Sequence, residues 1–180
     1  MEEKIVYFEK HDKENTAEVI RLSKERAIAR DITKIVLAST RADTAREFSK
    51  ALSDTDIKLV VVAWQYGFKE EQPFWLDLIP ELEAQGHKVH FGTMLFHATE
   101  LFGEERLRLI ASLLRTFGEG FKTAFEILLI ATDSGKVTHG ETVVVVGGSG
   151  AGADTAIVAT AASSLKFHEL HIQEIIAKLR

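Results

Sequence analysis

The chain contains no cysteine and only two prolines in 180 residues. The lack of cysteine excludes disulfides, thiolate catalysis and cysteine-ligated metal sites. No apolar run approaches the roughly 18–20 residues of a membrane-spanning helix, and the segment Met1–Lys4 lacks the basic and apolar regions that begin a signal peptide. Acidic residues outnumber basic ones by 27 to 22, with both signs interspersed, whereas nucleic-acid binding requires a basic face. We therefore expect a cytoplasmic protein without a nucleic-acid or membrane partner.

Hydrophobic residues make up 46% of the chain, enough for one sizeable core, so residues 1–180 are expected to form a single domain. The segments Leu59–Val62 and Val143–Val146 are apolar throughout, which is typical of parallel strands covered on both faces. The periodicity predicts strands at 4–8, 33–39, 57–64, 88–91, 142–146 and 171–179, and helices at 16–30, 43–52, 73–85, 104–134 (bent near Gly118 and Gly120) and 154–163. This alternation predicts a three-layer α/β/α domain.

Two loops rich in glycine or hydroxyl residues each follow an apolar strand, and each is expected to open a helix. The first is 39–44 (Ser-Thr-Arg-Ala-Asp-Thr), and the second is 147–155 (Gly-Gly-Ser-Gly-Ala-Gly-Ala-Asp-Thr). A helix N-terminus carries unpaired N–H groups and a partial positive charge, and glycine lets the backbone approach a phosphate closely. The loops predict a phosphate site, although the first could also be a plain βα turn with Asp43 as N-cap.

The second loop formally matches the dinucleotide fingerprint through Gly148, Gly150 and Ala153. That fingerprint normally stands in the first βαβ unit of a domain, with several strands after it. Here only one strand is expected after it, which argues against binding of a complete dinucleotide. The chain also lacks a Walker-type phosphate-loop sequence. A smaller phosphorylated ligand is the remaining prediction.

Aromatic side chains follow the second core strand at Trp64, Tyr66 and Phe68, with Gly67 between the last two. Rings at this edge either stack on a planar heterocycle or pack under the neighbouring helix, and the sequence leaves both interpretations open. Gly67 would permit close approach to a ligand.

The histidines provide no clear catalytic set. His97 stands three residues before Glu100, but two potential ligands on one turn are weak evidence for a metal, and we expect none. His87 and His90 bracket a strand and are interpreted as structural. Glu126 lies in a largely apolar helix, so its carboxylate is either paired or close to the site.

Several segments together resemble a known family: 7–9, 14–16, 38–44, 67–68, 120–122 with 126–127, and above all 147–156. The chain resembles the carboxy-terminal α/β domain of pyruvate kinase, and more closely the stand-alone archaeal and bacterial proteins of that fold, which have no assigned reaction. The resemblance implies a mixed five-stranded sheet of order 3-2-1-4-5 with the last strand antiparallel. In pyruvate kinases the loop matching residues 39–44 helps to hold the phosphates of a sugar bisphosphate, and the stand-alone relatives imply flavin mononucleotide (FMN) there.

With this strand order, the strands at 33–39 and 142–146 are neighbours, so both loops meet at the topological switch point of the sheet. Arg41 is the only cation in either loop and could add a charge-assisted contact to a phosphate. The predicted cofactor-binding residues are Ser39, Thr40, Arg41, Ala42, Thr44, Trp64, Tyr66, Gly67, Phe68, Gly147, Gly148, Ser149, Gly150, Gly152, Asp154 and Thr155.

Three function classes fit these residues: an FMN-binding protein, a sensor of a phosphorylated metabolite such as a sugar phosphate, and an assembly module with purely structural loops. Transfer of phosphate from phosphoenolpyruvate is not expected, because that machinery lies in another pyruvate kinase domain. The apolar stretch from Leu107 to Ile130 and the apolar last strand predict a homo-oligomer.

Overall fold

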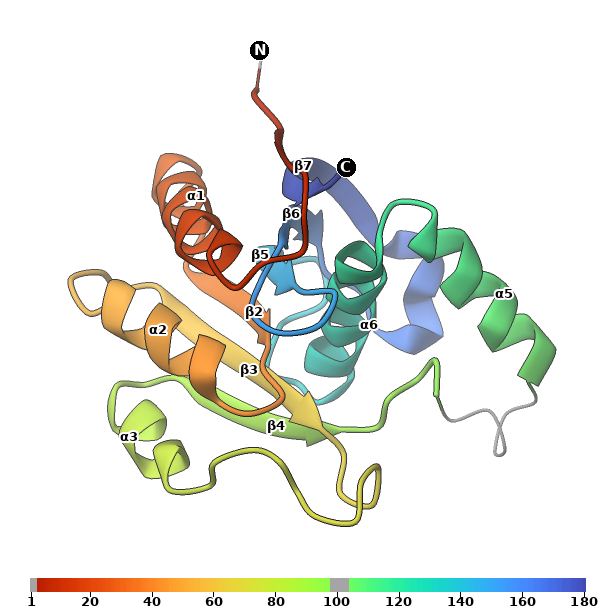
Figure 1. Ribbon diagram of the computed structural model, residues 1–180, viewed down its shortest axis with the longest axis horizontal. Coiled ribbons are helices and arrows are strands. Elements are labelled where there is room, and N and C mark those ends of the chain that lie inside the picture. The colour runs from red at the N-terminus through yellow and green to blue at the C-terminus, as the bar shows by residue number, and fades with distance from the viewer. Residues whose placement is uncertain (1–2, 98–103) are drawn as a thin grey trace.

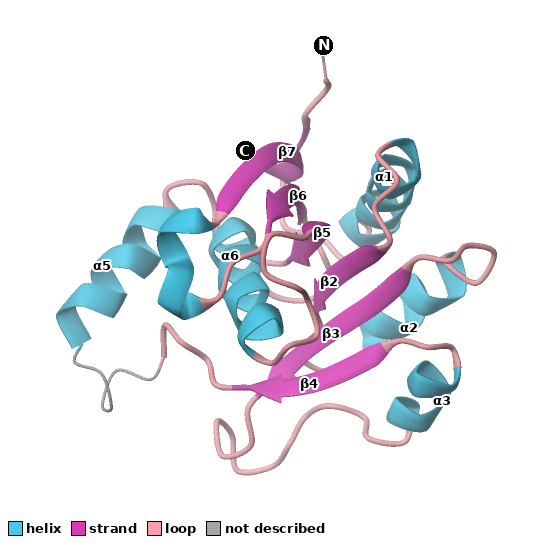
Figure 2. Ribbon diagram, turned by 180° about the vertical axis from the view of Figure 1, so that it is seen from behind, coloured by secondary structure: helices cyan, strands magenta, loops and turns pink. Residues whose placement is uncertain are grey.

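The computed structural model describes residues 3–97 and 104–180. It is an α/β fold in which helices cover both faces of a seven-stranded mixed sheet (Figures 1 and 2). The elements are β1 (Val6–Phe8), α1 (Asn15–Ala29), β2 (Lys34–Ala38), α2 (Asp43–Ala51), β3 (Lys58–Trp64), α3 (Leu78–Ala84), β4 (Lys88–Gly92), α5 (Glu104–Arg115), α6 (Glu119–Asp133), β5 (Thr142–Gly147), β6 (Thr155–Thr160), the 3₁₀ helix η1 (Ser164–Glu169) and β7 (His171–Leu179). Among the described residues, every helix is too short or too polar to span a bilayer.

The strands follow one another across the sheet in the order β1-β7-β6-β5-β2-β3-β4. β2 pairs in parallel with β3 on one side and with β5 on the other, and β4 continues beyond β3. The expected neighbours among these four strands are therefore confirmed. The sheet has seven strands rather than five, however, and the antiparallel strand is β6, which pairs with both β5 and β7. The C-terminal strand β7 consequently runs in the same direction as β5.

The prediction of a helix at 154–163 is wrong, because Thr155–Thr160 form strand β6. Its sequence, Thr-Ala-Ile-Val-Ala-Thr, is compatible with a helix or a strand when read locally. Every residue from Thr155 to Ala159 is buried beside the valines of β5, and β-branched side chains pack well on such a two-sided surface. The second glycine-rich loop therefore joins two antiparallel strands and does not open a helix.

The helices differ from the expected ones mainly at their ends. The stretch 104–134 is divided into α5 and α6, and the break lies at Gly118, whose φ of 121° favours glycine. The helix expected from Pro73 begins only at Leu78. Helix α1 begins at Asn15, one residue before the expected start, and the Asn15 side chain donates a hydrogen bond to the carbonyl of Lys10.

The core is divided by the sheet into two layers. Helices α1, α2 and α3 pack on one face through side chains such as Phe48 and Leu82. Helix α6 covers the other face with Leu128 and its neighbours, and α5 packs outside α6 (Figure 1). The crossover from β2 to β3 thus lies on one face and that from β4 to β5 on the opposite face. The adjacent strands β2 and β5 form a topological switch point, where open α/β sheets bind ligands.

Candidate functional site

The two predicted loops lie side by side at the carboxyl edge of the sheet. The parallel register pairs Leu37 of β2 with Val146 of β5, so the chain leaves both strands at the same level. Loop 39–44 then enters α2, and loop 148–154 turns back into β6. The sequence predicted that both loops lead into a helix, and only the first one does.

Loop 39–44 is held in shape by Ser39 and by an unusual backbone at Ala42. The Ser39 hydroxyl accepts a hydrogen bond from the N–H of Ala45 (3.3 Å), and the Ser39 N–H donates to the carbonyl of Val62 (3.1 Å). Ala42 occupies the N-cap position of α2 with φ 76°, in the left-handed region, and provides no side-chain cap. Asp43 is the first helical residue, so it is not the N-cap.

Three polar side chains of this loop have no polar partner among the described residues. Within residues 3–97 and 104–180, no hydrogen bond or ion pair is found for the side chains of Thr40, Arg41 or Thr44. Arg41 is exposed, whereas Thr44 is 8% exposed and lies in the first turn of α2. A cation, two hydroxyls and a helix N-terminus whose N-cap residue has no side-chain acceptor therefore belong to the one short loop where the sequence predicts a phosphate.

The second loop is organised around the buried carboxylate of Asp154, which is 1% exposed. One carboxylate oxygen accepts from the N–H of Ser149 (2.8 Å), and the other accepts from the hydroxyl of Thr155 (2.7 Å). His11 Nδ1 lies 3.4 Å from the same carboxylate. Asp154 and Thr155 are thus occupied in holding the loop together.

Neighbouring segments tie down other N–H groups of this loop. The Thr16 hydroxyl at the start of α1 accepts from Ala153 (3.0 Å), and His11 Nε2 accepts from Ala151 (3.3 Å). Gly152 has φ 82°, and a Cβ there would lie 2.4 Å from the Thr16 hydroxyl. Glycine is therefore required at 152 by the fold itself.

The loop also caps α6. The Ser149 hydroxyl accepts a hydrogen bond from the N–H of Gly120 (3.2 Å) in the first turn of that helix. A Cβ on Gly147 would lie 2.2 Å from the carbonyl oxygen of Gly120, and one on Gly148 would lie 2.2 Å from that of Gly152. These glycines allow α6 to approach the sheet and the loop to close on itself. Gly150, in contrast, is exposed.

The predicted aromatic residues gather at the end of β3. The ring of Phe68 contacts the rings of Trp64 (centroids 4.9 Å apart) and His97 (5.3 Å) in edge-to-face geometry. Tyr66 packs on Phe91 of β4 (5.0 Å) yet is 61% exposed. Gly67 has φ 82° with open space around it. The rings pack on one another and on β4, and Tyr66 presents the largest accessible surface among them.

A buried ion pair lies close to this cluster. Lys122 Nζ is 2.9 Å from one Glu126 oxygen, and the side chains are 3% and 1% exposed. The other oxygen accepts from the N–H of Phe96 (2.8 Å) and lies 3.7 Å from His97 Nδ1. Burial alone would raise the pKa of Glu126, but His97, Lys122 and the Phe96 N–H outweigh it and hold the pKa below its usual value. Glu126 is therefore paired, one of the two expected alternatives.

Lys122 was not anticipated as the partner of Glu126, although the Lys-x-x-x-Glu spacing on one helix is a visible signal for such a pair. Glu100, considered above with His97 as a weak metal pair, lies outside the described residues. Among the residues that the structure describes, no group of three histidine or acidic side chains could hold a metal ion. His87 is buried, and its Nδ1 accepts from the N–H of Leu59 (3.2 Å), which fits the structural role expected for it.

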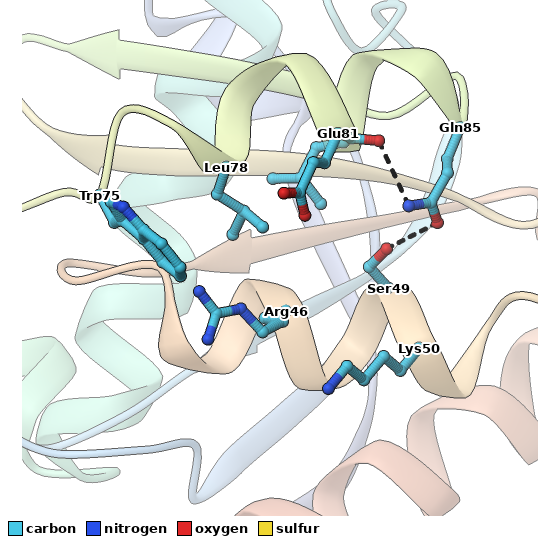
Figure 3. A pocket seen from close by; sticks show the side chains of 8 residues that line it. Arg46, Ser49, Lys50, Trp75, Leu78, Glu81 and Gln85 are labelled. Atoms are coloured by element: carbon cyan, nitrogen blue, oxygen red, sulfur yellow. Dashed lines mark hydrogen bonds between the residues drawn. The ribbon is translucent and has the colours of Figure 1, made fainter.

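A groove between α2 and α3 was also not anticipated (Figure 3). It has a volume of about 280 Å³, and the Arg46 guanidinium lies 3.9 Å from the centre of the Trp75 ring at one end. At the other end, the Ser49 hydroxyl donates to Gln85 (2.8 Å). Only the packing of α3 on α2 brings these side chains together, so the sequence carried no signal for this groove.

No protein-family model matches this chain. The resemblance to the pyruvate kinase domain rests on the motifs quoted above and stays a prediction.

Proposed function

We propose that this protein binds a phosphorylated small molecule at the carboxyl edge of β2 and β5, with FMN as the ligand. The observation that carries the proposal is the first loop: within the described part of the chain, the side chains of Thr40, Arg41 and Thr44 make no hydrogen bond or ion pair, and they belong to the segment that leads into α2. A phosphate there would accept hydrogen bonds from both hydroxyls and from N–H groups of the helix. Arg41 would add a charge-assisted contact.

The two loops have different roles in this proposal. Loop 39–44 supplies the polar contacts, while most of loop 147–155 serves as a rigid wall. Asp154, Thr155 and Ser149 are engaged in internal hydrogen bonds, so direct contacts from this loop would come from the exposed backbone around Gly150. The hydroxyls of Ser149 and Thr155, predicted above as cofactor-binding groups, are therefore not proposed as phosphate contacts.

The aromatic residues at the end of β3 suit a flat ring next to the phosphate. Tyr66 offers an exposed ring, and Trp64 and Phe68 line the same strand end. When bound, the isoalloxazine would supply redox chemistry. The residues of this chain would hold and orient it.

A second candidate is a sensor of a phosphorylated metabolite such as a sugar phosphate. The packing of Trp64, Phe68 and His97 on one another favours it, because rings engaged in such contacts offer less surface for stacking. Recognition would then depend on Arg41 and the hydroxyls of the first loop.

Calorimetric titration with FMN, inorganic phosphate and a sugar phosphate tests the shared part of both candidates. Thr44→Val and Arg41→Ala each remove a contact to a charged group, worth about 1.5–3 kcal/mol, so affinity should fall roughly ten- to hundredfold. Thr33→Val, just before β2 at the opposite edge, is the matched control and should bind like the wild type. Unchanged affinity in both loop variants refutes the site.

Two further variants separate the candidates. If FMN is the ligand, Trp64→Ala and Tyr66→Ala should weaken FMN binding more than phosphate binding, and the fluorescence of bound flavin should change. If both variants bind FMN normally while Arg41→Ala abolishes binding of the sugar phosphate, the sensor is the correct interpretation.

A further inference from the structure

The buried ion pair of Lys122 and Glu126 is a costly way to fill two positions of α6. The two side chains are 3% and 1% exposed, in a helix whose other buried residues are mostly apolar. Taking two charges out of water offsets much of their attraction, so a buried pair can often be replaced by apolar side chains without loss of stability. Buried charges with shifted pKa values gather at functional sites, and a functional role is therefore worth seeking for this pair.

His97 connects the pair to the surface of the protein. Its Nδ1 lies 3.7 Å from the Glu126 oxygen that also accepts from the N–H of Phe96, and its side chain is 37% exposed. A carboxylate on this side favours the neutral ring with its proton on Nδ1, which leaves Nε2 as an acceptor. Among residues 3–97 and 104–180, His97 Nε2 has no hydrogen-bond partner.

This histidine belongs to the aromatic residues of the proposed ligand site. Its ring packs edge-to-face on Phe68 (5.3 Å), and Phe68 packs on Trp64 at the end of β3 (4.9 Å). Neighbouring strands are about 4.8 Å apart, so the ends of β2 and β4, with β3 between them, are separated by about 10 Å. FMN spans such a distance between its phosphate and its ring. A phosphate on loop 39–44 is therefore compatible with a ring beside Phe68 and His97.

Helix α6 borders the same site from the other face of the sheet. Its first turn is tied to loop 147–155, because the N–H of Gly120 donates to the Ser149 hydroxyl (3.2 Å). The part of α6 that carries Lys122 and Glu126 thus begins beside this loop. Helix α2 packs on the opposite face of the sheet (Figure 1). A ligand at the switch point would lie between the start of α2 and the start of α6.

We propose that His97 binds the heterocycle of the phosphorylated ligand through Nε2, and that Glu126 positions the imidazole for this contact. The inference rests on the proposed function and adds the residue that distinguishes one phosphorylated compound from another. The neutral imidazole accepts a hydrogen bond from a ring N–H, such as the imide N–H of FMN. Loop 39–44 holds the phosphate that all such ligands share, and inorganic phosphate lacks the part that reaches His97.

Calorimetric titration at pH 8 tests the contact. His97→Ala should weaken FMN binding roughly five- to tenfold, the effect of one neutral hydrogen bond, and leave the affinity for inorganic phosphate unchanged. His97→Gln should recover part of this loss, because its amide oxygen is also an acceptor. His139→Ala is the matched control: His139 is 35% exposed and lies 2.8 Å from the Glu169 carboxylate, but it precedes β5 at the opposite edge of the sheet. This variant should bind both probes like the wild type.

Nitrogen-15 NMR of the imidazole at pH 8 tests the positioning role of Glu126. In the wild type, the proton of His97 should reside on Nδ1, and FMN but not inorganic phosphate should shift the Nε2 signal. The double variant Lys122→Met, Glu126→Leu replaces the buried pair with apolar side chains, so His97 should change to a mixture of both tautomers and FMN should bind more weakly. Circular dichroism verifies the fold of each variant.

Three results would each overturn the proposal: FMN affinity unchanged in His97→Ala, an equal loss of affinity for FMN and phosphate, or an unchanged tautomer in the double variant. If Thr44→Val and Arg41→Ala still weaken binding, the phosphate site stands and only the role of His97 is wrong. A wild type that binds phosphate but not FMN overturns the role of His97 and leaves the metabolite sensor. A wild type that binds neither probe refutes the proposed function as well.

Discussion

Replacing Lys122 with methionine leaves the Glu126 carboxylate buried without its cation. The two side chains are 3% and 1% exposed and 2.9 Å apart, and only the Phe96 N–H (2.8 Å) and the more distant His97 Nδ1 (3.7 Å) would remain beside the Glu126 carboxylate. Removing one partner of a buried ion pair costs about 3–5 kcal/mol, because the remaining charge is uncompensated. For a chain of this length, each kcal/mol lowers Tm by about 2–4 °C, so Lys122→Met should melt roughly 6–20 °C below the wild type.

The double variant Lys122→Met, Glu126→Gln is the matched control for this loss. The glutamine amide carries no charge, and its oxygen can still accept the hydrogen bond from Phe96. Neutralising both partners of a buried pair costs much less than removing one, so the double variant should recover most of the lost stability. Urea denaturation at pH 7, followed by circular dichroism, gives the free energy of unfolding of all three proteins.

The pH dependence provides an independent check. Because the pKa of Glu126 lies below its usual value in the folded protein, this group stabilises the fold at pH values above the unfolded pKa of about 4.3, and the contribution is lost as the pH falls through the folded pKa. In Lys122→Met, burial is no longer offset by the lysine, so Glu126 takes up a proton at higher pH. The stability gap between variant and wild type should therefore narrow from pH 7 toward pH 4.

A destabilisation below about 1 kcal/mol at pH 7 would contradict this reasoning. So would a double variant as unstable as the single one, since the loss would then reflect packing and not charge.

Two further outcomes follow from other parts of the fold. Gly152→Ala should lower the stability clearly more than Gly67→Ala. Both positions have φ 82°, but only at Gly152 would a Cβ meet a neighbour, the Thr16 hydroxyl at 2.4 Å. Equal melting temperatures of the two variants would argue against this close approach. This result also means that substitutions at Gly152 test folding and not ligand binding. Burial lowers the pKa of His87, so its neutral form supports the fold above the unfolded pKa of about 6.5 and stability is lost as the pH falls below that value. His87→Gln keeps an acceptor for the Leu59 N–H but has no titratable ring, so its melting temperature should fall less than that of the wild type as the pH drops below about 6.5. A pH profile like that of the wild type would exclude His87 as the source of the stability loss.

The candidate site was only partly visible in the sequence. Loop 39–44 was predicted correctly as a strand-to-helix connection, because the hydroxyl-rich turn is short and α2 follows at once. The engagement of Asp154 with Ser149 and Thr155 was not foreseen, since its partners depend on how the loop closes. The glycines at 147 and 148 were interpreted as space for a phosphate, whereas the folded chain uses that space for α6 and for the loop itself.

The sequence by itself determined those strands and helix ends for which a single local signal dominates. Runs such as Leu59–Val62 and Val143–Val146 form buried strands whatever their neighbours, because so many β-branched side chains must leave water together. Gly118 ended a helix because its backbone conformation suits no other residue. Tertiary structure decided the rest: β6 became a strand because the place beside β5 is buried on both faces, and the carboxylate of Glu126 became buried because the chain after β4 packs on α6. Burial depends on the whole fold, and local sequence does not encode it.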